Sequence, residues 1–219
     1  MIRVALDYSG DEIAVAAVDE TGRLLAERRA KVFGRSSAKL PAIVQDALSA
    51  ADMDFSDVGE WIVGVGPGSF TALRVAAAFA LGATHGTSIP VRGIPSACGL
   101  CGGLTEERAL ALYDGRKGEL LAFGLRRADG FYVPDGFQGV LTKREELDPS
   151  RWDAFVVRDA DCGAAHAFAP DCELHVAQGV DVATLARMPK ELCNCKPTEP
   201  IYLRPAVFVD PRPLRTFGG

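Results

Sequence analysis

Apolar and polar positions alternate near the start of the chain and then change to a helical period. Residues 2–7 alternate between apolar and other side chains, and residues 13–18 are apolar on both faces, so the pattern predicts a hairpin of two strands. Residues 23–32 predict a third strand whose charged side chains suit the edge of a sheet. From 40 to 51, apolar side chains recur every three or four positions, which predicts a helix with one apolar face.

Residues 61–84 predict a strand, a glycine-rich turn and a helix. The strand, at 61–65, is apolar throughout, as expected for a strand covered on both faces of a sheet. Free amide groups at the start of a helix can bind a phosphate or carboxylate, so the turn is a candidate anion-binding loop. A structural turn capped by serine or threonine is the favoured interpretation, because the turn has neither a P-loop lysine nor GxGxxG spacing. The residues of this loop are Gly66, Pro67, Gly68, Ser69 and Thr71.

The helix that follows the turn is rich in small side chains. Ala72, Ala76 and Ala80 recur every four residues, and Ala83 follows them. Such a stripe lets a second helix approach closely. The pattern leaves two interpretations equally open. Either the alanines pack on the chain's own sheet, or part of the alanine surface meets another helix or subunit while larger side chains such as Phe79 face the sheet.

The second half of the chain repeats the order of the first, with strands before alternating helices and strands. A boundary near residue 105 therefore divides the chain into two lobes, 1–105 and 106–219. From residue 189 onward the chain is rich in proline, which predicts an extended closing segment. The remaining predicted strands are at 89–94, 109–113, 120–125 and 154–157, with a hairpin turn at 129–130. Short helices are predicted at 96–104 and from Asp181 to Met188. Thr142 and Glu145 form a capping box that predicts one more short helix.

Composition narrows the classes of function. With 219 residues and 48% apolar content, the chain can bury a sizeable core, in one large domain or in two lobes. Its net charge of −5 disfavours direct, strong binding to RNA, which relies on Lys and Arg. The N-terminus lacks the apolar core of a signal peptide, and the longest uncharged stretch, 75–91, contains histidine and proline, so no membrane span is expected. We expect a soluble, cytoplasmic protein.

The six cysteines include a CxxC pair, Cys98 and Cys101, and a CxC pair, Cys193 and Cys195. A disulfide framework is not expected in a chain without an export signal. Two close pairs also suggest a four-sulfur zinc site, but CxC spacing is atypical for zinc. Reduced and mostly buried thiols are the favoured interpretation, and no metal is predicted.

No set of residues matches a known catalytic pattern. The three histidines fit no metal-binding spacing, and the serine of GPGSF does not lie in a GxSxG elbow. Asp7, Ser9 and Gly10 give the strongest enzymatic hint, because a phosphate-facing hairpin with an aspartate for a metal ion has this composition. A turn closed by the aspartate or serine side chain is favoured over that function. No catalytic residue is therefore predicted.

Four stretches of the sequence together resemble one protein family. They are ALDYSG at 5–10, GVGPGSFTALRVA at 64–76, YDGRKGEL at 113–120 and YLRP at 202–205. These stretches are similar to motifs of the bacterial TsaB family, also called YeaZ, and they run along nearly the whole chain. The resemblance implies an α/β chain with a duplicated actin-like fold (ASKHA, ribonuclease H-like), in which each of two lobes has a mixed sheet flanked by helices.

The same resemblance implies an accessory function in tRNA modification. TsaB-like proteins are non-catalytic partners of TsaD, which carries an HxxxH metal site and adds threonylcarbamoyl to the adenosine next to the anticodon of tRNAs that read codons starting with A. TsaE, an ATPase, joins them. The resemblance further implies that the N-lobe helices bind TsaD or a second copy of the chain, that tRNA is met only within the complex, and that the chain has no cofactor of its own. The implied contact residues are Ala72, Arg74, Ala76, Ala80 and Ala83.

Two departures from the family pattern bear on these expectations. Ala72 and Ala76 stand where the family usually has glycine, which still keeps the helix surface small. Tyr8 stands where threonine is usual, so the loop at 7–10 would be at most a vestigial nucleotide loop. The alternatives are an actin-fold kinase or ATPase that uses this loop and the glycine turn, and a peptidase. The sequence decides neither whether a nucleotide sits at the subunit interface nor whether Arg74 contacts a partner or the C-lobe of its own chain.

Overall fold

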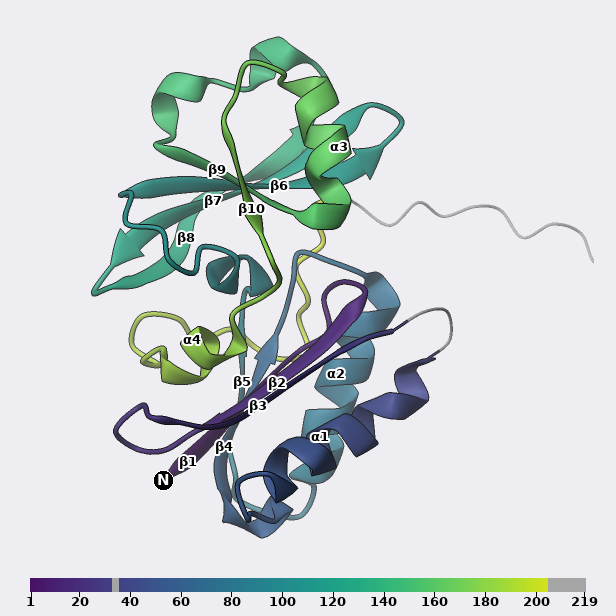
Figure 1. Cartoon of the computed structure of the whole chain (residues 1–219), viewed down its shortest axis with the longest axis vertical. Coiled ribbons are helices and arrows are strands. Elements are labelled where there is room, and N and C mark those ends of the chain that lie inside the picture. The colour runs from purple at the N-terminus through teal and green to yellow at the C-terminus, as the bar shows by residue number, and fades with distance from the viewer. Residues whose placement is uncertain (33–35, 205–219) are drawn as a thin grey trace, which may run out of the picture.

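The computed structural model describes residues 1–32 and 36–204, which form the two lobes seen one above the other in Figure 1. Each lobe contains one five-stranded mixed sheet. In both sheets the first three strands form an antiparallel meander, and the fourth and fifth strands run parallel to the first. The two lobes therefore repeat one topology, which confirms the duplicated α/β fold that the motifs implied.

The N-terminal sheet has its most buried strands at its centre, where helices can cover both faces. The strand predicted at 61–65 is one of these. It corresponds to β4, in which every residue except Gly59 is buried. The strands, which pair in the order β3-β2-β1-β4-β5, are β1 (Ile2–Asp7), β2 (Glu12–Val18), β3 (Leu24–Lys31), β4 (Val58–Gly64) and β5 (Val91–Ile94).

Two helices, α1 (Leu40–Ser49) and α2 (Phe70–Ala83), cover one face of this sheet (Figure 1). The predicted apolar stripe of α1 is confirmed, because Leu40, Val44, Ala47 and Leu48 are its buried residues. Pro41 lies in the first turn, where its missing amide hydrogen costs no helical hydrogen bond. Two short 3-10 helices, η1 (Ser36–Lys39) and η2 (Phe55–Asp57), precede α1 and β4.

The C-terminal sheet pairs its strands in the equivalent order, β8-β7-β6-β9-β10. Helix α3 (Asp159–Phe168) connects its last two strands, as α2 does in the N-lobe, and the short helices η4 (Arg144–Glu146) and η5 (Pro149–Arg151) occupy the place of α1 in the chain order. The strands are β6 (Arg108–Arg116), β7 (Glu119–Ala128), β8 (Phe131–Leu141), β9 (Ala154–Arg158) and β10 (Leu174–Ala177).

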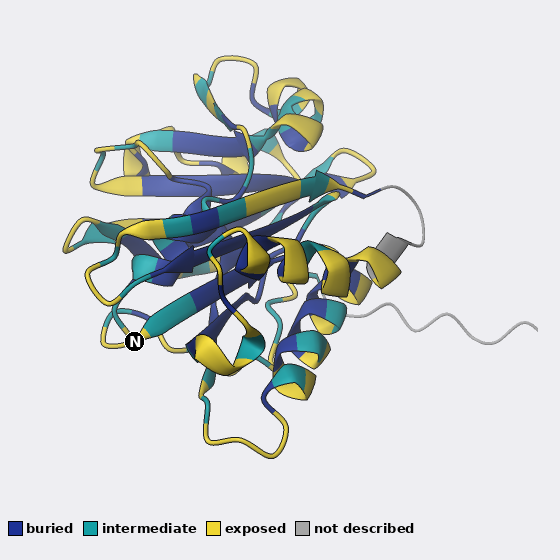
Figure 2. Ribbon diagram, turned by 60° about the horizontal axis from the view of Figure 1, so that its bottom comes forward, coloured by how far each residue is buried: buried dark blue, intermediate teal, exposed yellow. Residues whose placement is uncertain are grey.

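A shared apolar core joins the two lobes. Helix α4 (Val182–Arg187) follows the C-terminal sheet but packs on β1 and β2, on the face opposite to α1 and α2. The core cluster around it includes side chains of both sheets, such as Ile62 and Val156, together with Leu185 of α4, and all three are fully buried. Figure 2 shows the same burial along the strands, while the outer sides of α1 and α2 are partly exposed. In the described ranges, no helix has both the length and the apolarity needed to cross a bilayer.

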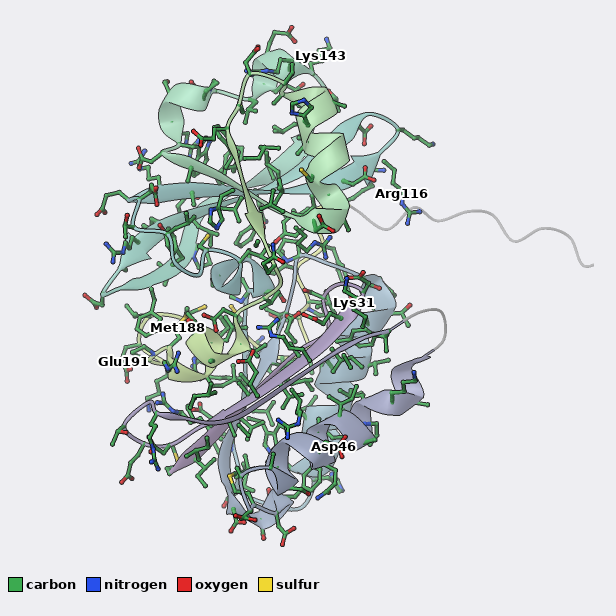
Figure 3. All side chains as sticks on the ribbon, in the orientation of Figure 1. Lys31, Asp46, Arg116, Lys143, Met188 and Glu191 are labelled. Carbon is green, nitrogen blue, oxygen red and sulfur yellow. The ribbon has the colours of Figure 1, made fainter. Side chains whose placement is uncertain are left out.

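After α4 the chain returns along the N-lobe as an extended segment, residues 189–204, which we call the strap. Figure 3 labels Met188 and Glu191 where the strap begins. Cys195 forms an isolated antiparallel bridge with Gly93 of β5, and the amide of Ile201 donates to the carbonyl of Val65 at 2.8 Å. The extended segment predicted after residue 189 is thus present up to residue 204, and the prolines predicted to follow at 205, 211 and 213 lie outside the described residues.

Two predicted helix details are wrong. The helix expected at 96–104 is only a 3-10 turn, η3 (Ser96–Gly99), because Gly99 packs closely on the backbone before α4 and further glycines follow it. The capping interaction expected between Thr142 and Glu145 is instead made by Glu146, whose carboxylate accepts from the Thr142 amide at 2.7 Å. In contrast, Asp181 caps α4 as expected, since its side chain accepts from the amide of Thr184.

Candidate functional site

Two loops that are far apart in the sequence, the Asp7–Gly10 hairpin and the glycine turn, meet at the junction of the lobes. Strands β1 and β4 are parallel neighbours, so the loops at their carboxyl ends lie at the same edge of the sheet. The amide of Ser69 donates to the carbonyl of Ser9 at 2.8 Å. A Cβ atom on Gly68 would lie 2.2 Å from that same carbonyl oxygen, so only glycine permits this approach. The Asp7–Gly10 hairpin and the glycine turn therefore form one rigid unit.

The carboxylate of Asp7 is buried in this unit and is held by the chain itself. Its Oδ1 accepts from the amide of Ser9 at 2.9 Å and from the hydroxyl of Ser9 at 2.8 Å. Its Oδ2 accepts from the hydroxyl of Ser96, which in turn accepts from the amide of Gly66 at 3.0 Å. The favoured interpretation of a turn closed by aspartate and serine side chains agrees with these contacts. Ser96, which the sequence analysis missed, links the two loops.

Two amides of the glycine turn donate hydrogen bonds within the chain. The amides of Gly66 and Ser69 donate to Ser96 and to the Ser9 carbonyl, as described, and Gly66 has a φ of 98° that favours glycine. Pro67 is buried between them, and Thr71 is exposed. Ser69 occupies the N-cap position of α2, but neither Ser69 nor Thr71 caps the helix with its side chain, contrary to expectation. The contacts of these two amides fit the interpretation of a structural turn.

A partly buried ion pair of the C-lobe faces the hairpin loop. The Arg158 Nε donates to Asp161 Oδ2 at 2.6 Å, and the guanidinium carbon lies 4.9 Å from the centre of the Tyr113 ring. Burial works against the positive charge, but the hydrogen bond and charge of Asp161, with Tyr113 and Asp7 nearby, raise the pKa of Arg158. A Cβ atom on Gly10 would lie 3.0 Å from Arg158 Nη1, so the two lobes touch at this point.

The space between the lobes is small at this junction. The cavity has a volume of about 90 Å³ and is lined by Asp7, Ser9 and Gly10 from the N-lobe and by Arg158 from the C-lobe. Pockets that bind small organic ligands usually measure about 300–1,000 Å³. Sequence reasoning could not identify Arg158 or Tyr113 for this place, because only the folding of the C-lobe brings them opposite the hairpin.

The alanine stripe of α2 packs inside its own lobe. Ala72 is 6% exposed, and Ala76 and Ala80 are fully buried in the core beneath α2. Phe79 contacts Trp61 edge to face, with ring centroids 6.0 Å apart, and is only partly buried. The first of the two interpretations of this stripe thus matches the structure. A partner of α2 would meet its other side, and of the five predicted contact residues only Arg74 is exposed and Ala83 half-buried.

The exposed side of α2 carries a cluster that we call the α2 surface, defined by Phe70, Arg74, Leu81 and Tyr202. Phe70 is 47% exposed, and its ring lies 4.9 Å from that of Tyr202 in the strap. The guanidinium of Arg74 lies 3.7 Å over the Phe70 ring, and its Nε donates to the Tyr202 hydroxyl at 3.1 Å. Arg74 therefore contacts the strap of its own chain. Leu81, 37% exposed, continues the same helix face two turns later.

Sequence comparisons find relatives that match parts of the chain. A family model described as TsaD, tRNA N6-adenosine threonylcarbamoyltransferase, matches residues 32–131. An uncharacterized protein of Mycobacterium tuberculosis is 31% identical over 128 residues, 58% of this chain and 59% of that protein. The tRNA threonylcarbamoyladenosine biosynthesis protein TsaB of Escherichia coli is 32% identical over 82 residues, 36% of each protein. The match thus spans little more than half of the mycobacterial protein and about a third of the E. coli protein.

Comparison with solved structures extends over nearly the whole chain. YeaZ from Pseudomonas aeruginosa has a TM-score of 0.73 and 22% identity, covering 92% of this chain and 99% of that one. An uncharacterized protein with similarity to peptidase YeaZ from P. aeruginosa has a TM-score of 0.74 and 22% identity, covering 93% and 99%. The chain is thus an α/β protein with the duplicated actin-like fold. In sequence, the chain is similar over part of its length to a protein named TsaB and to the TsaD family model.

Proposed function

We propose that this chain is a non-catalytic accessory subunit that activates a TsaD-like threonylcarbamoyltransferase by binding it through the α2 surface. The similarity to the E. coli relative supports the pathway, since that relative is named for tRNA threonylcarbamoyladenosine biosynthesis. The observation that carries the proposal is the α2 surface, where stacked aromatic and arginine side chains are ordered by mutual contacts and yet exposed. Such residues supply much of the binding energy of protein interfaces.

The location of the exposed apolar side chains supports the same surface. The described residues leave five large apolar side chains exposed, and three of these, Phe70, Leu81 and Tyr202, belong to the α2 surface. The other two, Met1 and Leu24, lie at the start of β1 and of β3, and belong neither to α2 nor to the strap. A gathering of exposed apolar area on one helix face is typical of a protein-binding site.

The proposal includes the order in which partners assemble. In the cytoplasm the isolated chain pairs with a second copy through the α2 surface, and the TsaD-like subunit displaces that copy because it uses the same residues. The TsaE-like ATPase joins the heterodimer, and tRNA is contacted only within the complex. The net charge of −5 agrees with the last point, since nucleic acid is bound mainly by basic surfaces.

The contacts of Asp7 favour this function over a kinase or ATPase. A phosphate-transfer enzyme of this fold would need Asp7 and the glycine turn free for a metal-bound phosphate. Here both oxygens of Asp7 accept hydrogen bonds from Ser9 and Ser96, and the adjoining cavity of about 90 Å³ is small for a nucleotide. Calorimetry with ATP and magnesium distinguishes the two, and tight binding with turnover by the isolated chain would reverse our preference.

The surroundings of Ser69 likewise disfavour a peptidase. A serine nucleophile needs a base within hydrogen-bond distance. Ser69 is exposed, and within the ranges 1–32 and 36–204 its hydroxyl makes no hydrogen bond to a histidine or a carboxylate. Peptide cleavage that is lost in Ser69→Ala would restore the peptidase hypothesis.

A matched pair of variants tests the α2 surface. Leu81→Glu places a charge on α2, and Leu24→Glu places the same charge on edge strand β3, where the leucine is similarly exposed, at 40% against 37%. Because an interface must desolvate the new carboxylate, we expect Leu81→Glu to weaken co-purification with the cognate TsaD-like protein at least about tenfold, whereas Leu24→Glu binds like the wild type. Both variants should keep the wild-type melting temperature within a few degrees.

The modification assay completes this test. Threonylcarbamoylation of tRNA by the reconstituted TsaD-like and TsaE-like proteins should depend on the chain and fall in parallel with the binding of Leu81→Glu. Equal binding by the two variants would refute the α2 surface as the contact. Full tRNA modification without the chain would refute the accessory function itself.

A further inference from the structure

Two cysteine side chains of the strap lie close together outside the site described above. The Sγ atoms of Cys193 and Cys195 are 3.9 Å apart. Cys193 is 7% exposed, and Cys195 is half-buried, so a small molecule in solution can reach only the second sulfur readily. The CxxC cysteines, Cys98 and Cys101, are buried in the same core cluster.

Backbone contacts hold this cysteine pair in place. The amide of Cys195 donates to the carbonyl of Gly93 at 2.9 Å, and the amide of Gly93 donates to the carbonyl of Cys195 at 2.7 Å. The guanidinium of Arg92 donates to the carbonyls of Cys193 and Met188, and it forms a buried ion pair with Glu60 at 2.8 Å. The chain is therefore anchored on both sides of Asn194, and the short distance between the sulfurs follows from this anchoring.

We propose that Cys193 and Cys195 form a reversible thiol–disulfide modification site whose oxidant is a hydroperoxide. The Cys195 thiolate attacks one oxygen of the peroxide, and the O–O bond breaks. With hydrogen peroxide, this step converts Cys195 to a sulfenic acid and releases hydroxide. The sulfur of Cys193 then attacks the Cys195 sulfur as its proton passes to the departing hydroxide. Two thiols and one hydrogen peroxide thus give one disulfide and two waters, and a dithiol reductant reverses the change.

The surroundings of the four thiols explain why Cys195 reacts first. The hydrogen bond between the two sulfurs lowers the pKa of Cys195 to about 7 and raises the pKa of Cys193. Burial raises the pKa of Cys98 and of Cys101, so these thiols stay protonated at neutral pH. The nucleophile is thus the accessible member of the pair, and its partner is already within 3.9 Å.

A disulfide between cysteines two residues apart is easily reduced. The bond needs sulfurs about 2.05 Å apart, with a defined torsion, and the short loop leaves little freedom to satisfy both. Strained disulfides have more oxidising potentials than structural ones and are the reversible ones. This fits a site that is modified and restored, and does not fit a permanent cross-link.

Mass spectrometry of the full-length chain tests the proposal. After hydrogen peroxide at neutral pH, the tryptic peptide that begins at Glu191 should lose two hydrogen atoms, because it contains Cys193, Cys195 and no other cysteine. Dithiothreitol should restore its mass. Before oxidation, iodoacetamide should label Cys195 about fivefold faster than the half-buried Cys162 at neutral pH, since the larger thiolate fraction outweighs the lower nucleophilicity of a more acidic thiol.

Serine variants separate this pathway from the alternatives. In Cys193→Ser, Cys195 should stop at a sulfenic acid that dimedone traps, and in Cys195→Ser the Glu191 peptide should remain reduced. The control Cys162→Ser/Cys172→Ser should form the disulfide as the wild type does. A Cys98–Cys101 or Cys98–Cys195 disulfide as the main product, faster labelling of Cys162 than of Cys195, or a Glu191 peptide unchanged by peroxide would each overturn the proposal. These readouts do not depend on any partner of the chain.

Discussion

The contact between Asp7 and Gly64 decides how the first hairpin meets the glycine turn. A Cβ atom on Gly64 would lie 1.9 Å from Asp7 Oδ2, so the carboxylate occupies the space that a side chain would fill. This carboxylate also accepts the hydroxyl of Ser96, which joins the turn to η3. The absence of one methyl group thus permits a buried hydrogen-bond network, and such networks are costly to disturb.

Gly64→Ala should therefore destabilise the chain strongly for so small a change. We expect its free energy of unfolding to fall by about 1–3 kcal/mol, because the added methyl group must displace the Asp7 carboxylate from its hydrogen bonds. Urea unfolding measures the change. Gly82→Ala in α2 is the control, since a Cβ atom there meets nothing within 4 Å and alanine favours a helix. Unchanged stability of Gly64→Ala would show that Asp7 does not need this position.

At the scale of single residues, the sequence predicts contacts within one turn. It misses contacts between residues that are far apart in the sequence and meet only in the folded chain. The Asp7–Ser9 interaction spans two residues, and its side-chain types are typical of a closed turn. Ser96 is 89 residues from Asp7, and nothing in its local sequence indicates the contact. Arg158 likewise reaches the hairpin only because β9 is parallel to β6 in the other lobe.

Helix α2 shows how one element divides its surface between core and exterior. Small residues every four positions fit the close packing of a helix on its sheet as well as the approach of a second helix, so the sequence alone left both open. Ala76 and Ala80 lie in the core, whereas Arg74 and Ala78 are exposed. The small size of Ala76 and Ala80 thus serves packing inside the lobe and not the surface that we propose for a partner.

Two leucine substitutions on α2 separate its inner and outer sides. Ala76→Leu should lower the free energy of unfolding by about 1–3 kcal/mol, because a fully buried site has no room for three further carbons. Ala78→Leu should change it by less than about 0.5 kcal/mol, because that residue is exposed. Urea unfolding of both variants checks this. If Ala76→Leu were as stable as Ala78→Leu, the alanine stripe would have to lie on the outside of the lobe.

The elements that the sequence missed have weak patterns for physical reasons. Helix α3 buries only Asp161 and Ala165, so it lacks the apolar stripe that identified α1. Strand β8 contains Pro134, Gly136 and Gly139 and sits at the sheet edge, where such residues are tolerated. By contrast, the strands at the sheet centres were predicted correctly because both of their faces are apolar.

At the scale of the whole molecule, the shared core makes the two lobes interdependent. The chain crosses from the C-terminal sheet to α4, which packs on the N-terminal sheet, and the strap then follows the N-lobe. Ile62, Val156 and Leu185 belong to one buried cluster although they come from the two sheets and α4. Such a core contrasts with two lobes joined only by a linker, which unfold separately.

The two tryptophans report on this interdependence, since Trp61 lies in β4 of the N-lobe and Trp152 precedes β9 of the C-lobe, and both are buried. Single-tryptophan variants, Trp61→Phe and Trp152→Phe, allow the fluorescence of each lobe to be followed alone during urea unfolding. Because the core spans both sheets, we expect each variant to give the same midpoint by fluorescence as by circular dichroism. In both backgrounds, Leu185→Ala should lower the free energy of unfolding by about 2–5 kcal/mol. The urea midpoint reported by the fluorescence of Trp61 and the midpoint reported by Trp152 should fall equally. If the midpoint moved only in the variant that retains Trp61, α4 would stabilise the N-lobe alone.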